Sequence, residues 1–201
     1  NDSLQKYGVD SNTMMTLIIP NSYLMWWNSP VKNILSRFAD QRDKFWDGKR
    51  AAKATAMNLT PVQVYTMASI VEEETNKQED KGLIASVYMN RIKKGMKLEA
   101  DPTVKYAMRN FSLKRILHGH LQYPSPYNTY QNTGLPPGPI STASINTIDA
   151  VLDAPLTDYI FFVAKPDFKG YSNFASTYQQ HLIYARAYQR ALDSLILSRN
   201  K

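Results

Sequence analysis

Three consecutive glutamates, Glu72, Glu73 and Glu74, are the residues of this sequence best suited to acid–base chemistry. They follow a segment, residues 60–71, in which apolar side chains recur every three or four positions, as on one face of an α-helix. At about 100° per residue, Glu74 continues that face, whereas Glu72 lies about 160° from Glu74 and Glu73 about a quarter turn away. A run of glutamates is usually a solvated surface, but the helical phase directs Glu74 toward the interior.

A carboxyl group in the position of Glu74 is a candidate general acid. Apolar surroundings disfavour its charged form, and the negative end of the helix dipole has the same effect, so both raise its pKa. A carboxylic acid that stays protonated near neutral pH can protonate a glycosidic oxygen. The pattern leaves one alternative open, a structural ion pair between a buried Glu74 and a cation such as Arg91.

The segment that carries Glu74 has a complete helix start. Thr60 is a candidate N-cap, Pro61 suits the first helical position, and Gln63 completes a capping box. The same reasoning predicts further helices at residues 31–46, 79–94, 101–108, 142–154 and 176–197. Candidate N-caps of these helices are Asn76, Asp101 and either Ser141 or Thr142. Tyr178 is expected to face inward from the last helix.

Strand-like segments lie at residues 14–19 and 22–27, and a hairpin is predicted from residues 159–164 and 171–174. Residues 123–140 are rich in Pro and Gly, which excludes regular structure there. Long loops inside compact domains are often functional. These elements together predict a mainly helical α+β domain.

The composition narrows the choice of partner. The chain has 24 Lys and Arg against 17 Asp and Glu, and the net charge of +7 suits anionic surroundings such as envelope polymers or lipid headgroups. The basic residues form no long run and do not alternate with aromatic residues as nucleic-acid stacking platforms require, so we expect no nucleic-acid partner. No segment approaches the ~20 apolar residues of a membrane span. We therefore expect a soluble chain, with any signal or anchor upstream.

Metal and thiol chemistry are not indicated. The absence of cysteine rules out disulfides, thiolate metal sites and a cysteine nucleophile. The three histidines, His118, His120 and His181, lack the clustered carboxylates of a metal site, so we expect no metal and no cofactor. His181 shares an apolar helix face with Tyr178, and we expect it to be a core residue or to lie behind the site.

Five blocks, in one order from about residue 60 onward, give the sequence a specific resemblance to a known family. The blocks are residues 68–75, 85–91, 101–104, 127–130 and 134–140. In these blocks the chain resembles the endolytic murein transglycosylases, the MltG or YceG-like family. Glu73 stands where the family often has Lys. Glu99 and Ala100 stand where the family usually has two polar residues, directly before Asp101 and Pro102.

The resemblance implies a lysozyme-like catalytic domain with a small hairpin and a long C-terminal helix, in which Glu74 is the catalytic acid. It implies cleavage of the β-1,4 bond between N-acetylmuramic acid and N-acetylglucosamine in peptidoglycan. Glu74 would protonate the leaving oxygen and then accept the proton of the muramyl C6 hydroxyl, which closes a 1,6-anhydro ring. One acid/base residue then suffices, whereas ordinary glycosidases use two carboxylates.

Candidate substrate-binding residues lie in the long loop and at the start of the 101–108 helix. The loop offers ring faces, an amide and hydroxyls for an amide-bearing glycan, at Asn128 and Tyr130, with Tyr127 and Thr129 behind them. Asn128 can equally be a turn residue after Pro126. Asp101 is the best candidate for a second carboxylate, although its place before Pro102 favours a helix cap.

The resemblance also suggests how the chain is organised and where it works. Residues 1–50 are expected to be the end of a LysM-like or linker region with a connecting helix, and residues 51–201 the transglycosylase domain. Expected partners are peptidoglycan glycan strands and glycan-polymerising synthases, with a membrane anchor upstream and a role in terminating nascent strands. The expected location is the bacterial cell envelope, at the periplasmic or outer face of the cytoplasmic membrane. A hydrolytic muramidase and a non-catalytic glycan-binding domain are the competing interpretations.

Overall fold

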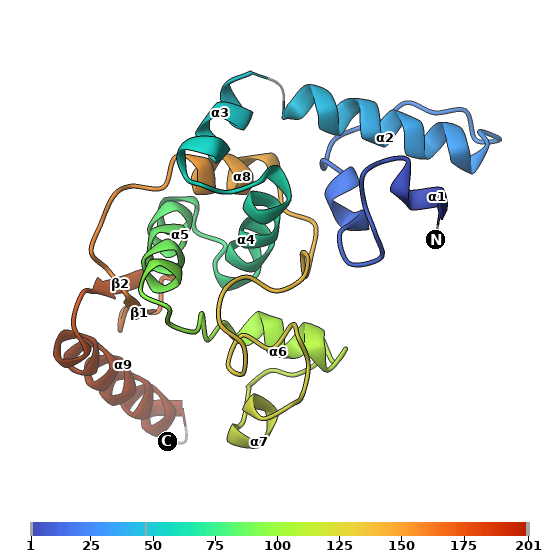
Figure 1. Ribbon diagram of the computed structural model, residues 1–201. Helices are drawn as coiled ribbons and strands as arrows, with labels where there is room; N and C mark the ends of the chain where they lie inside the picture. The colour runs from blue at the N-terminus through green and yellow to red at the C-terminus, as the bar shows by residue number, and fades with distance from the viewer. Residues whose placement is uncertain (1, 47, 200–201) are drawn as a thin grey trace.

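The computed structural model of the protein describes residues 2–46 and 48–199 (Figure 1). Most of this part of the chain is helical, with one short antiparallel hairpin, so the α+β prediction is confirmed. The elements in chain order are α1 (Asp2–Gln5), η1 (Met14–Leu17), α2 (Val31–Phe45), α3 (Lys49–Ala56), α4 (Pro61–Glu74), α5 (Gln78–Lys93), α6 (Asp101–Ala107), α7 (His118–Leu121), α8 (Ile145–Leu152), β1 (Phe161–Ala164), β2 (Ser172–Ala175) and α9 (Tyr178–Arg199).

Helix α4 begins as the sequence predicts. The Thr60 hydroxyl accepts a hydrogen bond from the Gln63 backbone N–H at 3.2 Å, and the Gln63 side chain accepts one from the Thr60 N–H at 2.8 Å. Pro61 occupies the first turn. A cap of this kind stabilises a helix by about 1 kcal/mol, and it fixes the point from which the helix runs to Glu74.

Helix α4 is the centre of the main core. It packs against α5, α6 and α8, and these helices lie together in the middle of the molecule (Figure 1). All eight residues from Val64 to Val71 are buried, so the middle of the helix is enclosed on every side rather than along one stripe. The stripe expected from the sequence was therefore too narrow, because three other helices surround this part of α4.

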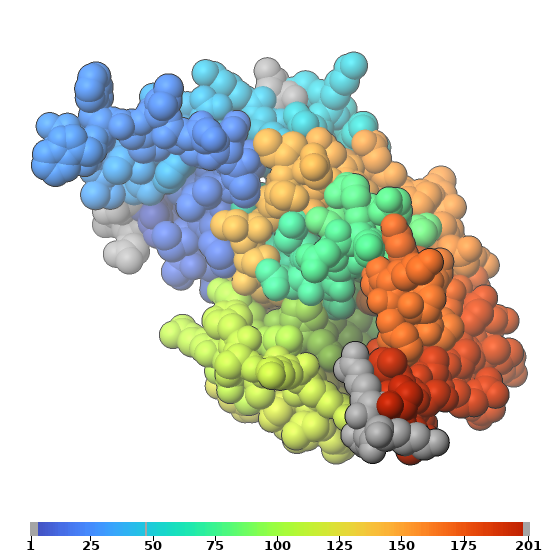
Figure 2. Space-filling view, turned by 180° about the vertical axis from the view of Figure 1, so that it is seen from behind, coloured from blue at the N-terminus to red at the C-terminus, as the bar shows by residue number. Residues whose placement is uncertain are grey.

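The C-terminal part of the chain adds a hairpin and a long helix to this core. Strands β1 and β2 pair antiparallel, with Phe161 opposite Ala175 and Phe162 opposite Phe174, which confirms the predicted hairpin. Helix α9 packs against both strands. The N-terminal segments and α9 lie at opposite ends of the molecule (Figure 2).

The predicted strands near the N-terminus are wrong. Residues 14–17 form the 3-10 helix η1, and residues 22–26 have no regular structure. A strand needs a hydrogen-bonding partner, and neither segment has one: Leu17 packs in a small cluster with Tyr7 and Ala39, whereas Leu24 and Trp26 are exposed.

Several helix ends also differ from the prediction. Helix α5 begins at Gln78 without a side-chain cap from Asn76, and the N-cap of α8 is Ser144 rather than Ser141 or Thr142. Helix α3 was not predicted; its residues Arg50 and Lys53 form ion pairs with Asp149 of α8 and with Asp153 at the C-terminal end of that helix, so they belong to the fold rather than to a free basic patch. Helices α1 and α7, four residues each, were also missed.

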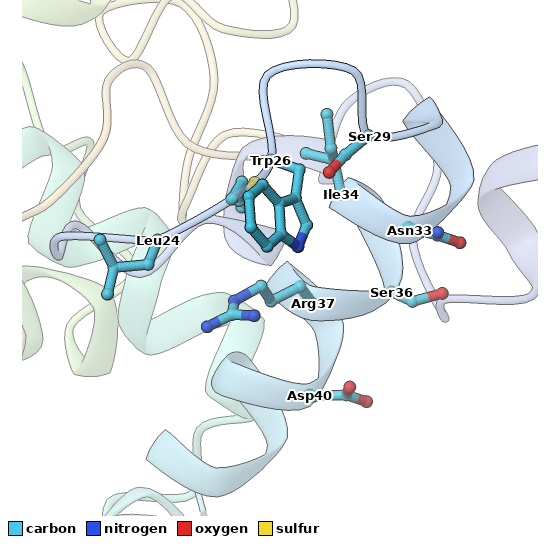
Figure 3. Close-up of a pocket in the computed structure, with 9 residues that line it drawn as sticks. Leu24, Trp26, Ser29, Asn33, Ile34, Ser36, Arg37 and Asp40 are labelled. Atoms are coloured by element: carbon cyan, nitrogen blue, oxygen red, sulfur yellow. The ribbon is translucent and has the colours of Figure 1, made fainter.

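The N-terminal part contains a hollow of about 760 Å³ between residues 24–29 and α2 (Figure 3). Trp26 lies at its edge and is 83% exposed. The one carboxylate that lines it, Asp40, is solvent-exposed, so the hollow holds no candidate acid. No helix in the described part of the chain combines the length and apolarity that a membrane span needs.

Candidate active site

Glu74 is the last residue of α4, at the border of two hollows. One hollow, of about 380 Å³, is formed where the ends of α4 and α5 meet α6, the long loop, β1 and α9. Its lining residues are Glu74, Arg91, Leu98, Glu99, Asp101, Tyr130, Phe161, Phe162, Tyr178 and His181. The other, of about 440 Å³, lies beside the turn after α4 and extends to Gly170. An extended polymer bound along both hollows would therefore pass Glu74.

The carboxyl group of Glu74 is largely enclosed and has a neutral hydrogen-bond partner. Burial raises its pKa to about 7, and the nearby charge of Asp101 adds to the rise. The Tyr88 hydroxyl, which donates to Glu74 Oε1 at 2.8 Å, and the charge of Lys105 act in the opposite direction. At neutral pH, therefore, Glu74 is divided between its acid and carboxylate forms, as a group that first gives and then takes a proton requires.

The ion-pair alternative for Glu74 is wrong. Arg91 instead donates to the Ile160 carbonyl at 2.8 Å and to the Leu98 carbonyl at 2.9 Å, and it forms an ion pair with Glu99 at 3.0 Å. Within residues 2–46 and 48–199, no salt bridge involves Glu74. An ion pair would have held Glu74 ionised; its absence is what allows burial to dominate the pKa.

Asp101 and Tyr130 lie in the same hollow as Glu74. The Tyr130 hydroxyl donates to Asp101 Oδ1 at 2.7 Å. The N-cap of α6 is Ala100 and no side chain caps the helix, so the expected role of Asp101 as a cap is wrong. Burial and the Asp101 carboxylate raise the pKa of Tyr130, which therefore stays a neutral donor. This pair presents a carboxylate and a phenol to the hollow.

Asn128 and Thr129 are inside the loop rather than on its surface. Asn128 is 0% exposed; its side-chain amide donates to the Leu121 and Tyr123 carbonyls, and its oxygen accepts from the Tyr130 backbone N–H. The Thr129 hydroxyl accepts from the Ala100 N–H at 3.0 Å. The sequence placed Asn128 in contact with substrate and Thr129 behind it; from their burial we infer that both instead hold Tyr130 and the start of α6 in place.

Tyr127 faces the N-terminal segment instead of the hollow. Its hydroxyl donates to Asn12 Oδ1 at 3.3 Å, and its ring packs on Tyr106 with centroids 4.8 Å apart. Close by, a Cβ at Gly138 would come within 2.1 Å of the Asn12 carbonyl oxygen, so only glycine allows this approach. The Gly-Pro part of the loop is thus fixed against the N-terminal segment, and Tyr127 is not among the residues that line the Glu74 hollow.

Glu72 belongs to a structural network that the sequence did not indicate. Its carboxylate accepts from Lys81 at 3.3 Å, from the Ser144 hydroxyl at 3.0 Å and from the Thr147 hydroxyl. Burial opposes the ionisation of Glu72, but these hydroxyls and the Lys81 charge outweigh it and lower its pKa. Lys81 itself is buried. Glu72 does point away from Glu74, as predicted, but toward α8 rather than toward solvent.

An aromatic part of the hollow's lining comes from residues that the sequence did not assign to the site, namely Phe161, Phe162, Tyr178 and His181. Tyr178 is 61% exposed, so its expected inward position is wrong. His181, expected in the core or behind the site, lines the hollow directly. Among the described residues, no three His, Cys, Asp or Glu side chains are grouped as metal ligands.

The raised pKa of Glu74 has a consequence for stability. Because the folded state binds the proton more tightly than the unfolded state, whose carboxyl has the usual value of 4.5, Glu74 stabilises the fold at low pH, and this contribution is lost as pH rises toward 7. We expect wild type to lose stability relative to Glu74→Gln between about pH 4 and about pH 8. Chemical unfolding of both proteins checks this, since carboxylates with lowered pKa values, such as Glu72, contribute equally to both curves. Parallel curves would contradict the raised pKa.

Comparison with known proteins shows which family and which proteins the chain is similar to. The model of the YceG-like family matches residues 2–187. A Bacillus subtilis protein named endolytic murein transglycosylase is 42% identical over 139 residues, which are 69% of this chain and 36% of that protein. A Streptococcus pneumoniae protein of the same name is 38% identical over 111 residues, 53% of this chain and 20% of that one. The chain thus spans about a third or less of these relatives. The crystal structure of a YceG-like protein from Listeria monocytogenes superposes with a TM-score of 0.74 at 30% identity, covering 90% of this chain and 61% of that one.

Proposed function

Because this chain belongs to the YceG-like family, we propose that it is the catalytic part of an endolytic lytic transglycosylase that cleaves peptidoglycan glycan strands. The observation that carries the proposal is Glu74, a carboxyl with a pKa near 7 that borders two hollows and has no ion-pair partner in the described chain. Two curated relatives named endolytic murein transglycosylase support it.

In the proposed reaction Glu74 acts twice. It first gives its proton to the oxygen that links N-acetylmuramic acid to N-acetylglucosamine, and the bond from the muramyl C1 to that oxygen breaks. The carboxylate then accepts the proton of the muramyl C6 hydroxyl while O6 bonds to C1, which gives a 1,6-anhydro end and returns Glu74 to its acid form. No water is consumed, and no metal or cofactor is needed, because one group supplies and recovers the proton.

The partners of Glu74 suit both steps. The Tyr88 hydroxyl donates to Glu74 Oε1, and a hydrogen bond to the carboxylate stabilises the ionised form that exists between the two proton transfers. Burial favours the neutral acid in the first step. In the same hollow the Tyr130 hydroxyl donates to Asp101, so the phenol oxygen and the Asp101 carboxylate remain as acceptors for the hydroxyls of the sugar.

Asp101 also bears on the competing reaction, hydrolysis of the glycan. Asp101 shares the hollow with Glu74 and does not cap α6, so it is the candidate for the second carboxylate that a hydrolytic muramidase would need. Digestion of purified peptidoglycan in ¹⁸O-labelled water separates the two reactions. We expect muramyl ends that are lighter by one water than reducing ends and that carry no label, read by mass spectrometry. Labelled reducing ends would establish hydrolysis, and glycan binding without any cleavage would establish a binding domain.

We propose further that the enzyme acts on nascent strands and ends their elongation, beside glycan-polymerising synthases at the outer face of the cytoplasmic membrane, with an anchor in sequence upstream of this chain. Residues 1–50 would then connect that anchor, through a LysM-like region, to the catalytic residues 51–201. A separate small cluster of Tyr7, Val9, Leu17 and Ala39 in the N-terminal part supports this division. Faster release of ends from newly polymerised, lipid-linked strands than from mature sacculi is the expected result.

A further inference from the structure

One residue that lines the hollow beside Glu74 has a buried polar atom without a hydrogen-bond partner. His181 Nδ1 is enclosed by protein and has no hydrogen-bond partner, and it is the one side-chain nitrogen or oxygen in the described residues with that combination. Buried polar atoms are nearly always paired, so an unpaired one in a functional pocket calls for a reason. The second ring nitrogen, Nε2, is not enclosed in this way, since His181 lines the hollow and remains partly exposed.

The imidazole of His181 is held firmly in this orientation. It stacks on Phe161 of β1, with ring centroids 5.1 Å apart and planes at 23°. The centroids of the His181 and Tyr178 rings are 6.2 Å apart. The guanidinium carbon of Arg91 lies 5.5 Å from the centroid of the Phe161 ring. The N–H groups of Arg91 donate to backbone carbonyls and to Glu99, not to His181. The orientation is thus set by stacking rather than by a hydrogen bond.

This environment decides where the proton of His181 resides. Burial and the charge of Arg91 lower the pKa of His181, so the ring is neutral at neutral pH and carries a single proton. A proton on Nδ1 would be an enclosed donor without an acceptor. A proton on Nε2 instead places an N–H donor at the open side of the hollow.

We propose that His181 uses Nε2–H to bind the acetamido carbonyl oxygen of the N-acetyl sugar next to the scissile bond, and so makes the enzyme selective for N-acetylated glycan. An acetamido group combines a strong carbonyl acceptor with a methyl group, and this wall combines a neutral N–H donor with the rings of Phe161, Phe162 and Tyr178. Removal of the acetyl group would take away both contacts. The assignment rests on the proposed function for the identity of the sugar, but the tautomer of His181 does not depend on it.

Three substitutions separate the donor from the packing. His181→Phe keeps an aromatic ring against Phe161 but removes the donor. His181→Gln places its amide nitrogen near the position of Nε2, whereas the shorter His181→Asn places it near Nδ1. Thermal unfolding of each variant establishes that differences in binding do not arise from loss of the fold.

The first measurement needs no catalysis. ¹⁵N NMR of the free protein, with the His181 signal assigned by its loss in His181→Gln, should show the Nε2–H tautomer at neutral pH. Titration with an N-acetylglucosamine oligomer should shift that signal, and a glucosamine oligomer should shift it less. An Nδ1–H tautomer, or equal shifts with both oligomers, overturns the proposal even if the protein cleaves glycan.

The second measurement uses the reaction. On N-acetylated strands His181→Phe should lower kcat/KM about three- to tenfold, mainly through KM, as expected for the loss of one neutral hydrogen bond. The preference for N-acetylated over de-N-acetylated strands should fall by the same factor, His181→Gln should restore it, and His181→Asn should not. An unchanged preference in His181→Phe overturns the proposal. If wild type makes no anhydro ends, the proposed reaction fails, while the oligomer titration still decides the role of His181.

Discussion

Replacement of Glu74 by Gln is expected to abolish the release of 1,6-anhydromuramyl ends, with a loss in kcat of about 10² to 10⁴. Glutamine keeps the size of the side chain and can accept the hydrogen bond from Tyr88, but it has no proton to give to the glycosidic oxygen. Since the substitution also removes a carboxyl whose ionisation burial opposes, we expect the fold to remain intact. Product analysis by mass spectrometry and a thermal unfolding curve measure the two effects.

The matched control is Glu79→Gln. Glu79 is an exposed glutamate in the first turn of α5 that lines neither hollow, so the charge change is the same and activity should stay near the wild-type value. Glu72→Gln, the control that helical phase alone recommends, is unsuitable because it would leave the buried Lys81 without its ion-pair partner. Near-native cleavage by the Glu74 variant would remove the basis of the proposed mechanism.

Asn128→Ala is expected to lower the free energy of unfolding by about 2 to 4 kcal/mol, because each buried partner left unsatisfied costs about 1 to 3 kcal/mol. The substitution deprives the Tyr123 carbonyl of its donor at 2.8 Å and the Tyr130 N–H of its acceptor at 3.0 Å. For a chain of this size the melting temperature should fall by roughly 5 to 15 °C. Activity at a temperature where the variant is fully folded should drop less than in Glu74→Gln, since no contact with substrate is removed.

Asn132→Ala is the control for that experiment. Asn132 lies in the same loop and also donates to two carbonyls, but it is solvent-exposed, so water replaces the lost hydrogen bonds and the effect should stay below about 1 kcal/mol. Equal destabilisation by the two substitutions would mean that the burial of Asn128 has no energetic weight. An Asn128 variant with native stability and no activity would restore the direct substrate contact that its burial argues against.

The sequence predicted those features that depend on local chemistry. The capping box at Thr60 and the hairpin both follow from contacts between near neighbours in the chain, and each is present. The sequence also predicted that Glu74 lies inward, and the structure encloses its carboxyl group against Tyr88 of α5. Its catalytic role stays a prediction.

Features that depend on distant contacts were missed or misread. Asn128 in a Pro-rich loop carries the same local signal whether its amide faces a ligand or its own backbone, and the outcome depends on how the loop folds over α6. Asp101 before Pro102 matches a cap, but Tyr130, 29 positions along the chain, takes up its carboxylate. His181 shares its periodicity with core residues, and only the position of β1 places it in the hollow.

The hollow beside Glu74 is assembled from segments that leave the ribosome at very different times. Its acid comes from α4 and its aromatic wall from β1 and the first turn of α9, so contacts of large sequence separation must form before the site exists. Closure of such long loops is slow compared with the formation of single helices. We therefore expect α4 and α5 to gain structure first and the hollow to close in the last folding step, which leaves a nascent chain inactive until its C-terminal helix has docked.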